Sequence, residues 1–180
     1  ELRNPIIMGS SGLTSSVEKI KQAEKYGAGA VVLKSIFEEE VALEYADFMK
    51  TAKKFATDSQ YFDYDGRKIP IDYYNYVVRE ENLKKYVTLI EESKKAVSIP
   101  VIASINCFLQ SVEWMAYAKQ LEAAGADALE LNMFFPPTDF KQTRVDRESI
   151  YFKVTEQVTQ HLSIPTALKI SHYFTDLGPM

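Results

Sequence analysis

Short apolar runs alternate with amphipathic stretches along this chain, and the runs come in two related forms. The first form begins with Gly-Ala and occurs at 27–35 and again at 125–132. The second begins with Ser-Ile-Pro and occurs at 98–106 and again at 163–171. Each run is the length of a buried strand and has Lys or Asn at or near its carboxyl end, so the repeats predict equivalent strands with polar ends.

The spacing of apolar residues predicts strands that alternate with helices. Such alternation indicates βαβ units and a parallel sheet. The expected strands are 4–9, 30–33, 101–105, 128–131 and 166–170, and the expected helices are 17–26, 38–54, 81–96, 112–123 and 149–160. The Tyr- and Asp-rich stretch 57–76 is predicted to be an inserted loop, either a lid over a site or a surface insertion.

The length of the chain, 180 residues, predicts a single domain over 1–180. A complete (β/α)8 barrel typically needs about 250 residues, and five parallel strands cannot close one. We therefore expect an α/β fold that forms the N-terminal part of such a barrel, with about the first five βα units. The alternative is an open sheet, which would need helices on both faces.

Composition narrows the function classes. The hydrophobic fraction of 46% is typical of globular chains, and the net charge of −4 predicts no nucleic-acid or membrane surface. No apolar run is long enough to span a bilayer. Cys107 is the single cysteine and only two histidines are present, so neither a disulfide framework nor a metal site is expected. A soluble cytoplasmic protein with a small-molecule substrate is predicted.

The polar residues at the strand ends are the main candidates for a site. Because the carboxyl ends of parallel strands share one face, Lys34, Asn106, Asn132 and Lys169 are expected to form one polar floor. An Asn amide suits a flat heterocycle with carbonyl and imide groups, although it also caps turns. Lys34 either contacts a ligand or pairs with an acidic residue at 38–40.

Further candidates lie in the turns that follow the strands. The turn Ser10-Ser11-Gly12 either admits the backbone of a cofactor or caps the next helix. His172 is a candidate acid or base, with a solvent-facing loop residue as the alternative. Cys107 is either a nucleophile or a small buried hydrophobe.

Taken in order, the motifs at the strand ends resemble those of the dihydroorotate dehydrogenase family, and the resemblance covers nearly the whole chain. The motifs are Asn4-Pro5, Ser10-Ser11-Gly12, Leu33-Lys34-Ser35, Ser104-Ile105-Asn106, Glu130-Leu131-Asn132 and Leu168-Lys169-Ile170-Ser171.

The resemblance implies a (β/α)8 barrel that holds FMN and oxidises dihydroorotate to orotate in pyrimidine biosynthesis. It also implies that a positive charge at Lys169 stabilises the reduced, anionic flavin. Lys34 and Lys169 would support the reaction. The implied cofactor-binding residues are Ser10, Ser11, Gly12, Lys34, Ser35, Asn106, Asn132, Lys169 and Ser171.

The chain departs from the family where the catalytic base is expected. The family carries Cys or Ser three residues after the Asn of the Glu-Leu-Asn motif, and Phe135 stands there in this chain. A later family Asn is replaced by Pro137, and the substrate-binding loop is replaced by the Tyr/Asp stretch. Either another group serves as base, with His172, Cys107 and Asp139 as candidates, or the substrate differs.

Three questions stay open at this point: the electron acceptor, the oligomeric state, for which a homodimer is one option, and the class of function itself. A flavin-binding barrel without dehydrogenase activity is one alternative. A phosphate-sugar barrel enzyme that uses Lys34 to form a Schiff base is another.

Overall fold

The computed structural model describes residues 2–37, 61–64, 67–106, 113–134 and 143–172. The chain divides into two compact units, one formed by 1–36 and 87–180 and the other by 37–86. The prediction of a single domain over 1–180 stays a prediction. The described elements are β1 (Ile7–Met8), η1 (Gly12–Thr14), α1 (Val17–Lys25), β2 (Ala30–Val32), β3 (Ile36–Phe37), β4 (Tyr61–Tyr64), β5 (Arg67–Pro70), α3 (Ile71–Ala96), β6 (Val101–Asn106), α4 (Glu113–Ala123), β7 (Ala128–Met133), α5 (Arg144–His161) and β8 (Thr166–Ile170).

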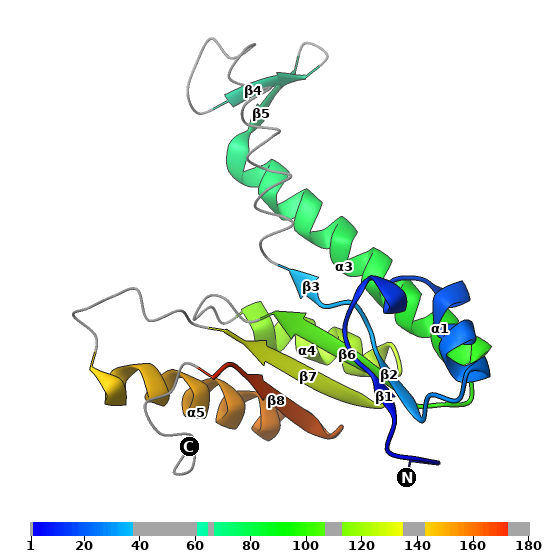
Figure 1. Cartoon of the computed structure of the whole chain (residues 1–180). Helices are drawn as coiled ribbons and strands as arrows, with labels where there is room; N and C mark the ends of the chain where they lie inside the picture. Colours follow the sequence, from blue (N-terminus) through cyan, green and yellow to red (C-terminus); the bar gives the residue numbers. More distant parts are fainter. Residues whose placement is uncertain (1, 38–60, 65–66, 107–112, 135–142, 173–180) are drawn as a thin grey trace. The chain divides into compact units, whose positions relative to one another are not determined.

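The first unit is built on a sheet in the order β1-β2-β6-β7-β8, so the strands lie in the order in which the chain makes them (Figure 1). Each neighbouring pair along this path is parallel. The short β3 also joins the sheet by pairing with β6. Parallel strands are joined by right-handed crossovers, and successive crossovers in one direction place their helices on one face of the sheet.

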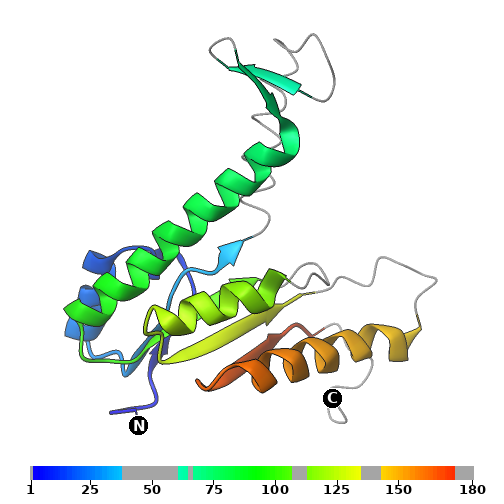
Figure 2. The same ribbon diagram turned by 180° about the vertical axis from the view of Figure 1, so that it is seen from behind.

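The burial of β7 shows that one face of this strand is covered and the other is partly exposed. Leu129, Leu131 and Met133 are fully buried, whereas the alternate residues Glu130 and Asn132 are half-buried. α4 contacts β7, α5 contacts β8, and the two helices contact each other; the view from behind shows both on the same side (Figure 2). A singly wound parallel sheet with one covered face is part of a (β/α)8 barrel, as predicted, and is not a doubly wound sheet.

Several predicted elements are confirmed closely. β8 coincides with the strand expected at 166–170, and α1 begins at the residue expected. The two Gly-Ala repeats also behave alike, because Gly27 and Gly125 follow α1 and α4 with φ of 97° and 94°. Only glycine adopts this left-handed conformation without strain, which is why both helices end there.

Other boundaries differ from the prediction. Within 57–76 the structure has the antiparallel pair β4–β5 and the start of α3, where a loop was expected. The sequence Asp65-Gly66 between those strands is a hairpin signal that the prediction did not use. α5 begins five residues early because Thr143 and Asp146 form a capping box. The helix expected at 38–54 lies outside the described residues.

Two glutamates hold the turns that lead into β6 and β8. Glu24 Oε1 accepts hydrogen bonds from the Ser98 hydroxyl at 2.6 Å and the Ser98 N–H at 2.8 Å. Glu122 Oε1 accepts from the Ser163 hydroxyl at 2.6 Å and the Ser163 N–H at 2.7 Å. Each glutamate precedes a Gly-Ala pair by three residues and binds the Ser of a Ser-Ile-Pro turn. The sequence repeat is therefore also a repeated contact.

Replacing Glu122 by alanine should lower stability in a way that depends on pH. The Ser163 hydroxyl and then the Ser163 N–H hold the pKa of Glu122 below its ordinary value of 4.5. A lowered pKa in the folded state contributes stability above the unfolded value, and this is lost as the pH falls through the folded value. The gap in unfolding midpoint between the parent chain and Glu122→Ala should therefore narrow between pH 7 and strongly acidic pH.

Thermal unfolding followed by circular dichroism measures this gap. Glu91→Ala is a matched control, because Glu91 is an exposed glutamate on α3. If the gap for Glu122→Ala stays constant on acidification, the ionised Glu122 carboxylate does not contribute to stability through its contacts with Ser163.

Candidate functional site

Three of the predicted residues lie in one row across the sheet. Asn106 of β6 is in register with Asn132 of β7, which is in register with Lys169 of β8. Asn132 Nδ2 donates to Asn106 Oδ1 at 3.2 Å. Asn106 is buried, with 8% of its surface exposed, Asn132 is half-buried and the Lys169 side chain is 45% exposed, so exposure increases along the row from β6 to β8. This arrangement follows from the strand ends of a parallel sheet sharing one edge.

A second row of polar side chains lies two residues earlier in β6 and β7. Ser104 of β6 is in register with Glu130 of β7. Glu130 Oε1 accepts from Ser104 Oγ at 2.7 Å and from Lys169 Nζ at 2.8 Å. The Glu130 side chain is 12% exposed and that of Lys169 is 45% exposed. The expected cost of a lysine on this face is therefore offset by a mostly buried carboxylate.

From Ser104 the hydrogen bonds continue to residues that follow β2 and β1. Ser35 Oγ lies 2.7 Å from Ser104 Oγ and 3.0 Å from Ser10 Oγ. The Ser35 N–H donates to Ser10 Oγ at 2.8 Å. Ser35 and Ser104 are buried, whereas Ser10 is half-buried. Five side chains from Ser10 to Lys169 are thus joined by direct contacts, and we call them the serine–glutamate line.

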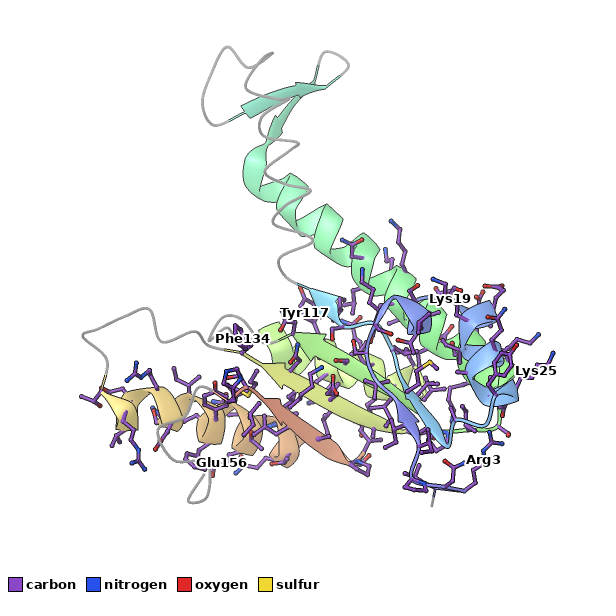
Figure 3. The ribbon with its side chains drawn as sticks, viewed as in Figure 1. Arg3, Lys19, Lys25, Tyr117, Phe134 and Glu156 are labelled. Carbon is purple, nitrogen blue, oxygen red and sulfur yellow. The ribbon has the colours of Figure 1, made fainter. Side chains whose placement is uncertain are left out.

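The turn Ser10-Ser11-Gly12 is divided between two roles. Ser10 belongs to the serine–glutamate line. Ser11 caps η1, because its Oγ accepts from the Leu13 N–H at 3.2 Å in a capping box with Thr14. The Gly12 carbonyl accepts from Lys19 Nζ at 2.7 Å, and Lys19 is labelled in Figure 3. The helix-cap alternative is confirmed for Ser11, and the cofactor alternative for this turn stays a prediction.

The remaining candidates are not joined to these rows by the contacts described above. Lys34 is half-buried, and its N–H donates to the Thr14 carbonyl at 3.3 Å. Ser171 is half-buried just after β8, and the next residue, His172, is exposed. Glu38, Glu39, Glu40, Cys107, Phe135, Pro137 and Asp139 lie outside the described residues.

Ser104 and Glu130 are central to the site, and neither was singled out from the sequence. Both lie two residues before an Asn that was singled out, so the period of two along a strand places them on the same face. A charged residue inside an apolar strand was the signal for Glu130.

The site offers hydrogen bonding on a polar surface. Within the part of the chain that the structure describes, the Asn132–Asn106 bond uses one Asn132 N–H and the Asn106 carbonyl, and Lys169 adds a cation to the same row. Donors and acceptors in one row fit the carbonyl and imide edge of a flat heterocycle such as a flavin. Among the described residues, no group of three or more His, Cys, Asp or Glu side chains is placed to hold a metal ion.

Comparisons with known proteins do not assign a family. The sequence matches no protein-family model and no curated protein. One similar solved structure is a dihydrodipicolinate synthase from Agrobacterium tumefaciens str. C58, with 17% sequence identity and a TM-score of 0.43. That match covers 91% of this chain and 42% of that protein, so this chain spans less than half its length. A similarity of this size does not assign a function.

Among the described residues, no helix has the length and apolar character needed to cross a membrane.

Proposed function

We propose that this chain is the flavin-binding part of an FMN-dependent oxidoreductase of the dihydroorotate dehydrogenase type, acting in the cytoplasm. The observation that carries the proposal is the row Asn106–Asn132–Lys169, which brings amide groups and a cation together on one face of the sheet. The motif resemblance implied these three residues as flavin contacts. Their alignment in a single row supports that reading.

In this proposal the row holds the flavin ring. Asn106 and Asn132 would bind its carbonyl and imide groups, and Lys169 would contribute its positive charge. FMN would supply the capacity to accept a hydride. Glu130 fixes the Lys169 ammonium through their 2.8 Å contact, which limits how far that charge can move. The protein therefore contributes binding, orientation and charge, while the redox chemistry belongs to the cofactor.

The substrate in this proposal is a small molecule with a CH–CH bond to oxidise, either dihydroorotate in pyrimidine biosynthesis or a related compound. Phe135 occupies the position of the family base and has no group that accepts a proton. The base must therefore come from elsewhere in the chain, or the substrate must differ. The electron acceptor is a separate partner of unspecified chemistry.

The test is the visible spectrum of the full chain titrated with FMN, compared with Lys169→Ala. A charge-assisted contact contributes about 1.5–3 kcal/mol, so Lys169→Ala should weaken FMN binding by about tenfold or more. Lys153→Ala is the control, because Lys153 is an exposed residue of α5. Absence of flavin binding by the parent chain would refute the proposal. Equal FMN affinity of Lys169→Ala and Lys153→Ala would show that Lys169 does not contact the flavin.

A flavin-binding protein without dehydrogenase activity is the second candidate. It is favoured by Phe135 at the base position and by the pairing of Lys169 with Glu130. Anaerobic addition of dihydroorotate to the FMN-loaded chain separates the two candidates. Bleaching of the flavin supports the dehydrogenase, and a persistent yellow colour with dihydroorotate and related dihydropyrimidines supports the binding protein.

A further inference from the structure

The direction of each hydrogen bond in the serine–glutamate line follows from counting protons. A hydroxyl has one proton, and Ser104 donates its proton to Glu130. Ser35 must then donate to Ser104 across their 2.7 Å contact. Ser10 must in turn donate to Ser35, since the Ser35 proton is already used. With Glu130 ionised, all three hydroxyls therefore point toward its carboxylate.

We propose that this line is a proton relay that links Ser10 to Glu130. In the ionised state Ser10 donates inward, so it presents only a lone pair to a ligand. When one proton moves along each bond, a ligand O–H, N–H or activated C–H bond breaks and a Ser10 O–H bond forms. The protons of Ser10, Ser35 and Ser104 each shift one oxygen inward, and Glu130 gains an O–H bond. No other reactant is needed, and the ligand keeps the electron pair.

The completed shift reverses the direction of the whole line. Protonated Glu130 then donates to Ser104, Ser104 to Ser35, and Ser35 to Ser10, which leaves the Ser10 proton facing the ligand. Ser10 therefore changes from an acceptor to a donor when Glu130 changes its charge. Hydrogen bonds in such a chain polarise one another, so the change at one end reaches the other.

The placement of the line suits this role. Its middle members Ser35 and Ser104 are 4% and 0% exposed, so water does not replace them as donors or acceptors. Its ends are more open: Ser10 is half-buried, and Glu130 contacts the 45% exposed Lys169. A proton can therefore enter at Ser10 and leave from Glu130 past Lys169.

Among the described residues, the charged side chain that contacts Glu130 comes from β8. Lys169 contacts it from that strand, while the neighbour on β6 is the uncharged Ser104 and the other members of the row are the neutral Asn106 and Asn132. When Glu130 takes up a proton, Lys169 loses its paired charge. The negative charge then lies on the ligand, at the Ser10 end of the line.

This relay deepens the proposed function and rests on it for the identity of the ligand. It supplies the proton acceptor that Phe135 does not supply. Its own existence is tested without flavin or substrate, so the relay and the oxidoreductase can fail independently.

The experiment is a pH titration of the full chain by NMR. The 15N shift of the Ser35 amide reports on Ser10 Oγ, to which that amide donates at 2.8 Å, and the 13C shift of the Glu130 carboxyl reports its charge. In the parent chain the two shifts should follow the same titration curve. In Ser104→Ala the Ser35 amide should lose this response while Glu130 still titrates, and Ser104→Thr should restore it.

Glu130→Gln provides a second variant, because it keeps an acceptor oxygen at Oε1 but does not titrate. The response at the Ser35 amide should disappear in Glu130→Gln even if Ser104→Ala does not fold. An unresponsive Ser35 amide in the parent chain would overturn the relay. So would a Ser35 response of equal size in Ser104→Ala, because it would show a through-space field instead of hydrogen-bonded transmission.

Discussion

Replacing Gly29 by alanine is expected to lower the free energy of unfolding by about 3 kcal/mol or more. A Cβ at this position would overlap the backbone oxygen of Asn4 and lie 2.7 Å from Asn4 Oδ1. The obstacle is backbone and not the end of a flexible side chain, so the clash cannot be relieved by a rotamer change. Gly29 has no positive φ, and the reason for glycine here is therefore close approach alone.

Asn4 cannot easily move away, because its side chain is held at both ends. Asn4 Nδ2 donates to the Gly27 carbonyl at 3.0 Å, and Asn4 Oδ1 accepts from the Ile6 N–H at 2.9 Å. Arg3, labelled in Figure 3, adds bonds to the carbonyls of Ala28 and Glu24. These contacts fix the segment that enters β1 against the turn that enters β2. The alanine variant would have to break them.

Gly9→Ala is the matched control for this prediction, since an added Cβ at Gly9 meets no atom within 4 Å. Its expected change is within about 0.5 kcal/mol, as for other surface substitutions. Urea denaturation followed by circular dichroism measures both variants. Equal stability of Gly29→Ala and Gly9→Ala would show that the backbone around Asn4 can shift to fit the added Cβ without lowering the free energy of unfolding.

The positions of β1, β2, β6, β7 and β8 could be predicted because each is a short apolar run closed by a turn or a polar residue. The same reasoning predicted that Asn106, Asn132 and Lys169 would lie together, since parallel strand ends share an edge. It did not predict which residues touch. Contact depends on the register between strands, and register is set by tertiary packing that no single segment records.

The serine–glutamate line shows this limit most clearly. Ser10 and Ser11 are neighbours of the same type, yet one joins the line and the other caps η1. Nothing in the local sequence separates them, because either hydroxyl can cap or face a site. Glu130 lies inside the Glu-Leu-Asn motif, and its two donors come from residues 26 and 39 positions away.

On the helix-covered face of the sheet, the depth of burial is expected to set how much a side chain contributes to stability, and one pair of leucines tests this. Leu131 of β7 and Leu168 of β8 are in register, but Leu131 is fully buried and Leu168 is 38% exposed. Leu131→Ala should cost about 2–5 kcal/mol, since it removes packed atoms and leaves a cavity. Leu168→Ala should cost clearly less, because part of that side chain is already in water.

Leu131→Ala also tests packing beneath the polar rows while leaving their polar side chains unchanged. Leu131 stands between Glu130 and Asn132 in β7, so its side chain packs on the face opposite to the one that carries the two polar rows. Leu131→Ala therefore removes support beneath the rows without changing any donor or acceptor in them. Chemical denaturation at neutral pH measures both variants. Equal losses would show that Leu131 and Leu168 have similar surroundings, against the difference in their exposure.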